Sequence, residues 1–234
     1  MILKWKYLFS ALMLLSFLSC TSERKIQNKG EPWQNKMPQV PGKIEFEYYN
    51  EGGEGIAYHD SDSINNGSGK LNPANGTFLN EFRMKEGVDI SYTKPGNIDN
   101  NAFNKVPRDM NKFYVGWTRP GEWINYTVKV NESERYTIGL LYTSNGDGTI
   151  SFDVDGKDAT GPLKINSTYD SGDTISWRQW HHWNKSDSIG LVTLKKGIHV
   201  LTLHIITNGN MNLDYMDLEI TYRNKRKPDV LSKK

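Results

Sequence analysis

The stretch that decides the fold is residues 123–154, WINYTVKVNESERYTIGLLYTSNGDGTISFDV. Hydrophobic side chains alternate with polar ones at 123–130, again at 136–142 and once more at 150–154. This period of two is typical of β-strands with one buried face. Asn-Gly-Asp-Gly at 145–148 and the Asp-Gly that follows residue 154 are turn sequences that join strands. The stretch therefore predicts consecutive strands arranged as two hairpins.

Similar alternation continues on both sides of this stretch. Residues 44–48 place Ile44, Phe46 and Tyr48 on one strand face, and closing strands are expected at 199–206 and 213–222. Residues 50–112 are rich in Gly, Asn and Asp and predict long ordered loops, with an insert from 65 to 111. We expect no helix longer than a turn or two. The prediction is an all-β protein, an antiparallel β-sandwich of the jelly-roll type.

The N-terminus has the pattern of an export signal. Two lysines precede an apolar run at 7–18, which is shorter than the ~20 residues of a membrane-spanning helix. Phe-Leu-Ser-Cys at 17–20 resembles a bacterial lipobox, which implies lipidation of Cys20; the alternative is an ordinary secretory peptide. The lipobox predicts a membrane-anchored lipoprotein of the bacterial outer membrane, at the cell surface or the periplasmic face. Cys20 is the only cysteine, so no intramolecular disulfide can form.

These patterns divide the chain into four parts. We predict a lipoprotein signal peptide at 1–19, a flexible tether at 20–42, one domain at 43–221 and a basic tail at 222–234. The formal charge of the chain is +2, and loss of the two lysines in 1–19 leaves zero. A mature chain without a basic excess does not indicate nucleic acid as a partner. The membrane contact is expected through the lipid alone, and the protein is expected to be a monomer.

A second distinctive segment is 173–184, DTISWRQWHHWN, which carries Trp177, Trp180 and Trp183. We call residues 173–184 the tryptophan loop. Flat aromatic faces beside amide and imidazole groups are what a sugar-binding cleft needs. The alternative is that all three indoles fill one end of the sandwich, because most tryptophans are structural.

Five segments in order resemble a family 6 carbohydrate-binding module. They are IEFEYYNEGGEGIAYHD (44–60), VGWTRPGEWINYTV (115–128), WRQWHHW (177–183), LKKGIHVLTL (194–203) and NMNLDYMDLEI (210–220). The resemblance implies a jelly-roll sandwich, sugar binding without catalysis in a loop-built cleft, and a structural calcium ion (Ca²⁺). Two features depart from the family pattern: the first loop is longer, and no catalytic domain accompanies the module.

The resemblance also implies roles for individual residues. Trp117 and Trp180 would stack on opposite faces of one sugar, and Asn212 would hydrogen-bond it, unless Asn212 is only a turn amide. Trp183 would belong to the core. The remaining carbohydrate-binding candidates are Trp177, which either extends the platform or packs on the loop, and Glu54 and His59 in the first loop.

The metal prediction concerns carboxylates of the first and last strands. Glu45 and Glu47 alternate with Phe46, so they share a face of the predicted strand, and Ca²⁺ prefers such oxygen ligands. The resemblance implies calcium, with Asp214 or Asp217 completing the set because the first and last strands pair in this fold. The alternative is a group of solvated surface acids.

The sequence is compatible with three candidate functions. The first is non-catalytic binding of a polysaccharide or oligosaccharide by a tethered lipoprotein, with no enzyme activity. The second is a small glycan hydrolase or lyase on the same sandwich, although no pair of acids stands out as acid and base. The third is an adhesin that uses the sandwich for protein contact.

Overall fold

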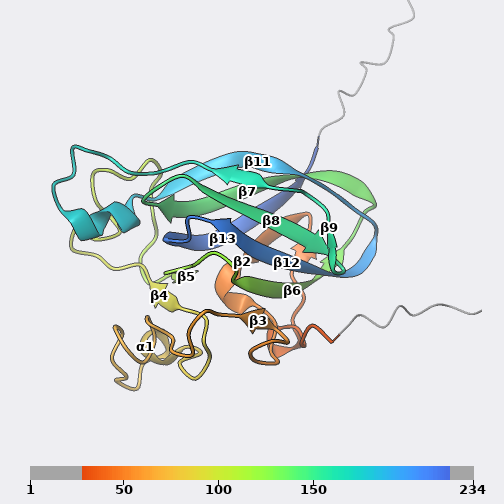
Figure 1. Cartoon of the computed structure of the whole chain (residues 1–234), viewed down its shortest axis with the longest axis horizontal. Helices are drawn as coiled ribbons and strands as arrows, with labels where there is room; N and C mark the ends of the chain where they lie inside the picture. Colours follow the sequence, from red (N-terminus) through yellow and green to blue (C-terminus); the bar gives the residue numbers. More distant parts are fainter. Residues whose placement is uncertain (1–27, 222–234) are drawn as a thin grey trace, which may run out of the picture.

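The computed structural model describes residues 28–221 as two β-sheets packed face to face (Figure 1). This confirms the predicted β-sandwich. One sheet has the order β1 (Gln39–Val40), β6 (Trp123–Val130), β12 (Gly197–Thr207), β8 (Gly148–Val154), β10 (Leu163–Ile165), with β3 (Tyr58–His59) on β6 and β9 (Lys157–Asp158) on β8. The other has the order β11 (Asn184–Leu194), β7 (Glu134–Ser144), β13 (Met211–Ile220), β5 (Phe113–Val115), β4 (Ile90–Tyr92), with β2 (Gly42–Glu45) on β13.

The core lies between the sheets and is formed by the apolar faces that the alternation predicts. Tyr126 and Phe152 reach it from one sheet, and Leu140 and Met216 from the other. Each is buried among hydrophobic neighbours. Burial of a large apolar side chain stabilises a fold by about 1.5–3 kcal/mol. These four strands therefore hold the two layers together.

One of the two predicted hairpins is wrong. The turn at 145–148 joins β7 to β8, but these strands belong to different sheets, so the chain crosses between the layers there. The turn after residue 154 does form a hairpin, because β9 pairs with β8. Alternation shows which side chains of a strand are buried. It does not show whether the next strand pairs with that strand in the same sheet or lies in the opposite sheet.

The first strand also ends earlier than predicted. β2 stops at Glu45, and a 3-10 helix covers Phe46–Tyr48. Phe46 is buried whereas Tyr48 is exposed, so the two do not share a face with Ile44 as a strand would require. A 3-10 turn rotates successive side chains by about 120° and breaks the period of two.

The N-terminal boundary of the folded part differs from the predicted residue 43. β1 pairs in parallel with β6, and Val40 is fully buried. A 3-10 helix at Trp33–Asn35 precedes it, and Glu31 bridges to Glu51. Residues 28–42 are thus part of the domain rather than a flexible tether, because they supply apolar surface and an edge strand to the sheet.

The insert contributes little regular structure. It contains one short helix, α1 (Phe78–Glu81), together with β4. Within residues 28–221, no helix is both long and apolar enough to cross a membrane. The predicted signal peptide, Cys20, residues 20–27 of the predicted tether and the predicted basic tail lie outside the described residues.

Candidate functional site

A cavity of about 280 Å³ lies at one end of the sandwich, beside the tryptophan loop. Figure 1 shows this loop in teal, projecting from the sheets at the left of the view. The volume is near the lower limit of the ~300–1,000 Å³ typical of small-molecule sites. The lining residues are mostly aromatic: Tyr114, Trp117, Trp177, Trp180, His181, Asn210 and Asn212.

Trp117 enters the cavity from the turn that follows β5. Its backbone has φ of 48°, in the left-handed region that a bulky side chain rarely adopts. Such a conformation costs on the order of 1–3 kcal/mol and persists only where the surrounding structure enforces it. Strain of this kind gathers at functional sites, so the backbone itself marks Trp117.

Trp180 lies in a 3-10 helix at Ser176–His181, and its carbonyl is fixed from two strands. Thr143 Oγ1 of β7 donates a hydrogen bond to that oxygen at 2.8 Å, and Asn212 Nδ2 of β13 donates another at 2.6 Å. Two donors on one carbonyl hold the loop against the sheet. The backbone of Trp180 is therefore held in place by β7 and β13 together.

Gly116 makes this arrangement possible. A Cβ atom at residue 116 would lie 2.7 Å from Asn212 Oδ1, closer than real Cβ contacts. Only glycine leaves room for the amide of Asn212 between the turn and the tryptophan loop. The segment Gly116-Trp117 thus leaves room for the Asn212 amide and directs the Trp117 side chain into the cavity.

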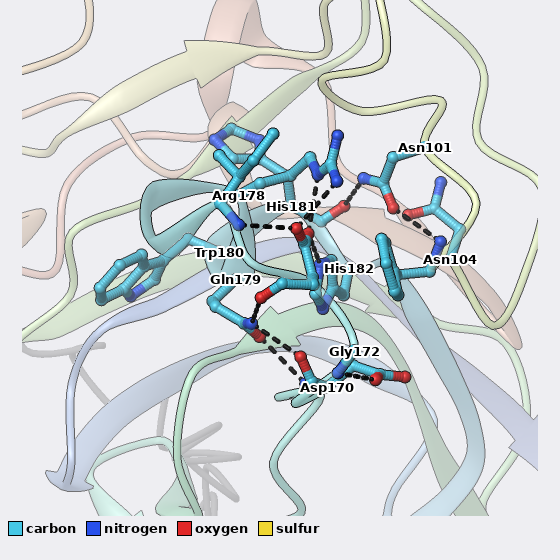
Figure 2. A network of polar contacts seen from close by, with 12 residues as sticks. Asn101, Asn104, Asp170, Gly172, Arg178, Gln179, Trp180, His181 and His182 are labelled. Carbon is cyan, nitrogen blue, oxygen red and sulfur yellow. Dashed lines mark hydrogen bonds and ion pairs between the residues drawn. The ribbon is translucent and has the colours of Figure 1, made fainter.

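A buried ion pair lies within the tryptophan loop and joins its first residue, Asp173, to Arg178 of the 3-10 helix (Figure 2). Arg178 donates from Nε and Nη2 to the two oxygens of Asp173, at 2.7 and 2.8 Å. His182 Nε2 also contacts Asp173, at 2.8 Å. The Arg178 hydrogen bonds hold the pKa of Asp173 below its usual range. Arg178 is buried in this pair, so it presents no basic patch to a ligand.

The end of the insert fastens the other side of the loop. Asp99 is fully buried and accepts hydrogen bonds from His181 Nδ1 and from Trp183 Nε1, both at 2.8 Å. Asn101 Nδ2 donates to the His181 carbonyl at 2.8 Å. Figure 2 shows Asn101 and His181 side by side. The insert therefore holds His181, which lines the cavity, in place.

The structure brings together four of the six predicted carbohydrate-binding residues. Trp117, Trp177, Trp180 and Asn212 all line the cavity. Trp177 is 51% exposed and meets the His181 ring edge-on at 5.8 Å, so it extends the aromatic surface. Trp183 is fully buried, as predicted for a core residue.

Glu54 and His59 are not brought to this cavity. Glu54 Oε1 contacts His59 Nδ1 at 2.5 Å, and His59 lies beside Trp123 with ring centroids 6.4 Å apart. Strand β3 places His59 at the edge of the other sheet, opposite Trp123. Because the first loop is longer than the family pattern, matching by position did not predict where these side chains lie.

Three lining residues were not predicted. Tyr114 comes from β5, His181 from the tryptophan loop and Asn210 from the turn before β13. The position of Tyr114, two residues before Gly116, could have indicated it. Nothing in the sequence indicated that Asp99 would contact His181.

The predicted metal ligands lie in different environments, and the buried Oε2 of Glu47 and Oδ2 of Asp214 have no hydrogen-bond partner among residues 28–221. Asp217 pairs with Lys185 at 3.2 Å on the face of β13 that also carries Tyr215. Asp214 sits at a β-bulge and forms a buried ion pair with Arg108. Within residues 28–221, no three His, Cys, Asp or Glu side chains are grouped to hold a metal.

Glu45 and Glu47 have different environments. Glu47 is buried, and desolvation raises its pKa well above the usual range, with a further contribution from the charge of Glu45. Glu45 is half-buried and lies 3.6 Å from Lys43. These two carboxylates do not share a strand face, because the chain turns into the 3-10 helix at Phe46.

A larger cavity, of about 490 Å³, lies near the N-terminal segment and includes Trp33, Tyr48 and Phe78 in its lining. The guanidinium of Arg83 lies 4.5 Å from the centre of the Trp33 ring, and the Tyr48 ring stacks on Trp33 with centroids 6.4 Å apart. The protein itself thus occupies the faces of this indole. In the smaller cavity, the faces of the aromatic rings are less covered by other side chains of the protein.

A family model described as carbohydrate binding module (family 6) matches residues 87–220, more than half of the chain. No curated protein matches the chain. Among solved structures, one similar chain is a family 6 carbohydrate-binding module studied by crystallography and isothermal titration calorimetry. It has 14% identity and a TM-score of 0.47, covering 79% of this chain and 98% of that one.

Two further solved structures illustrate the range of proteins with similar domains. A β-1,3-glucan-binding family 6 module from Bacillus halodurans has 12% identity and a TM-score of 0.45, covering 79% of this chain and 99% of that one. A family 43 arabinoxylan arabinofuranohydrolase from Bacillus subtilis, in complex with cellotetraose, has 14% identity and a TM-score of 0.47. That match covers 80% of this chain and 28% of the enzyme.

Proposed function

Because the chain belongs to carbohydrate-binding module family 6, we propose that it binds one unit of a neutral polysaccharide between Trp117 and Trp180 and catalyses no reaction. Carbohydrate binding itself follows from membership of the family. One observation carries the location of the site: Trp117, Trp180 and Asn212, from three separate segments, line the same cavity.

The chemistry of the cavity suits a sugar ring. Sugars present apolar C–H faces and a rim of hydroxyl groups, so they need flat aromatics and a few fixed polar groups. Asn212 already donates to the Trp180 carbonyl, which leaves its Oδ1 to accept from a hydroxyl. His181 is held by Asp99 at one ring nitrogen, so the other nitrogen can meet the rim.

The charges around the cavity support a neutral ligand. Arg178 is paired with Asp173, and the Asp99 carboxylate is paired with His181. A sulfated or carboxylated chain would need a cation that is free to pair with it. Stacking on the two indoles is therefore the main source of affinity in this proposal.

The test uses affinity electrophoresis and calorimetry against polysaccharides chosen from a glycan array. Loss of one aromatic at a binding centre costs ~2 kcal/mol or more, about thirtyfold in affinity. Trp117→Ala and Trp180→Ala should each abolish detectable binding with unchanged melting. Phe78→Ala is the matched control, because Phe78 is 65% exposed and lies in the larger cavity.

Two outcomes would contradict this proposal. Binding that survives both tryptophan variants but is lost in Phe78→Ala would move the site to the larger cavity. Release of reducing sugar from any polysaccharide by the pure protein would overturn the non-catalytic role and favour a hydrolase or lyase.

The setting of the domain is a further part of the proposal. We propose a monomer, tethered through lipidated Cys20 to the bacterial outer membrane at the cell surface or the periplasmic face. The lipobox-like sequence at 17–20 supports this. A binding module on such a tether would retain a polysaccharide close to the cell.

A further inference from the structure

We propose that Trp177 forms a second sugar subsite, so that the protein binds two adjoining units of a polysaccharide chain; this rests on the proposed function. The first unit would lie between Trp117 and Trp180, and the second would lie against the Trp177 indole. The ligand class is then an oligosaccharide of at least two units. A single sugar would occupy only part of the site.

The spacing of two tryptophans along one helix is the first observation. Trp177 and Trp180 are three residues apart in the 3-10 helix at Ser176–His181, and both line the cavity. In a 3-10 helix, residues i and i+3 eclipse, so their side chains leave the same side. A rise of ~2.0 Å per residue separates the two by about 6 Å along the helix axis. That separation is similar to the length of one pyranose ring, so the two indoles are spaced to meet neighbouring units of one chain.

The exposure of Trp177 places it at the mouth of the cavity. Its side chain is 51% exposed, whereas Trp117 and Trp180 are each partly buried. A large apolar side chain left in water forgoes the stabilisation that burial would give it. An exposed indole beside a cavity is therefore informative about binding. Trp177 lies outside the pair of indoles that would hold the first unit.

The backbone that carries Trp177 is held in place, although its indole is exposed. The next residue, Arg178, is buried, and its side chain pairs with Asp173. The Arg178 backbone N–H donates to the Ile175 carbonyl at 3.0 Å, and Arg178 Nη1 donates to the Asn97 carbonyl at 3.4 Å. A platform that is ordered before binding loses little conformational freedom when a ligand arrives.

Polar groups lie beside this indole. His181 lines the same cavity, and its ring centroid is 5.8 Å from that of Trp177. Its Nδ1 contacts Asp99 at 2.8 Å, which leaves Nε2 for a sugar hydroxyl. Asn210 also lines the cavity and is exposed. An aromatic face with a few placed polar groups is the composition that a sugar subsite needs.

The experiment compares a monosaccharide with a disaccharide, both prepared by partial hydrolysis of the polysaccharide that the wild-type protein binds in affinity electrophoresis. Calorimetry measures the disaccharide, and NMR chemical-shift titration measures the weaker monosaccharide. The wild type should bind the disaccharide about tenfold more tightly. Trp177→Ala should weaken disaccharide binding about tenfold and leave monosaccharide binding within about twofold, because it removes one aromatic contact of the second unit only.

Two further variants complete the design. Trp177→Phe keeps a smaller aromatic face and should recover part of the disaccharide affinity. Tyr169→Ala is the matched control, because Tyr169 is a 56% exposed aromatic outside the cavity lining, and it should bind both sugars like the wild type. All three variants should melt like the wild type, since each changes an exposed side chain.

Two results would overturn the second subsite. One is a Trp177→Ala variant with the disaccharide affinity of the wild type. The other is an equal loss for both sugars, which would place Trp177 at the first unit. In either case the proposed function stands if Trp117→Ala and Trp180→Ala still abolish binding. Polysaccharide binding that survives those two variants, or a wild type that binds no polysaccharide, would overturn the proposed function and the second subsite together.

Discussion

The backbone conformation of Trp117 shows that single residues determine the geometry of this site. An indole in the left-handed region is a conformational cost that folding must offset elsewhere. Beside Trp117, Gly116 leaves room for Asn212, and Asn212 holds the Trp180 carbonyl. Trp117 and Trp180 are therefore linked through the amide of Asn212 and the missing Cβ of Gly116.

This coupling gives a prediction at residue 116. Gly116→Ala should weaken glycan binding about tenfold, because its Cβ would displace Asn212 and release the Trp180 carbonyl, a loss comparable to one hydrogen bond. Calorimetry with the polysaccharide measures the effect.

The control for this prediction is a double-mutant cycle with Asn212→Ala. If Gly116 acts through Asn212, Gly116→Ala should have little further effect once Asn212 is alanine. Fully additive losses would show that the two residues act independently.

At the scale of elements, the sequence predicts where strands lie better than which strands pair. β6 occupies the predicted residues 123–130, and the predicted pairing of the first and last strands is confirmed by β2 on β13. The turn at 145–148 was misassigned as a hairpin, because alternation does not distinguish pairing within a sheet from packing across two sheets.

The site could be predicted only in part for a related reason. Trp117, Trp180 and Asn212 stand at fixed places relative to strands, so the order of motifs placed them together. Asp99 and Arg108 come from the insert, which has no periodicity that predicts its path. Their contacts depend on long-range packing, which short sequence patterns do not encode.

The loop after β3 predicts a pH dependence of stability. Burial raises the pKa of Asp60 to about 7, with smaller contributions from the charges of Glu122, Asp89 and Asp62. Burial likewise raises the pKa of Asp89 to about 6. Above about pH 4 an unfolded chain releases these protons while the folded protein keeps them, so stability falls as pH rises toward 7.

We therefore expect the melting temperature to fall between about pH 4 and pH 7, and Asp60→Asn to reduce that slope. Asp187→Asn is the control, because the Asp187 side chain is 93% exposed. Calorimetric melting at several pH values measures the slope. If the melting temperature changes equally with pH in Asp60→Asn and in the wild type, Asp60 is not the cause of the pH dependence.

At the scale of the whole molecule, the prediction is membrane attachment through Cys20. In a bacterial host fed a radioactive fatty acid, the wild-type protein should be labelled and sediment with membranes. Cys20→Ser should carry no label and stay in the supernatant, because it lacks the residue that would be acylated. Stable anchoring needs more than one acyl chain on the protein. A Cys20→Ser protein that still sediments with membranes would contradict the anchor.

The packing of residues 28–42 against the sandwich has a consequence for how far the domain can stand from a membrane. A free chain from Cys20 to residue 42 could extend about 75 Å, whereas from Cys20 to Asn28 it extends at most about 28 Å. With β1 bound to β6, the shorter length applies. A lipid-anchored domain would then capture only those polysaccharide chains that come within a few nanometres of the bilayer, and lengthening the chain before residue 28 should widen that zone.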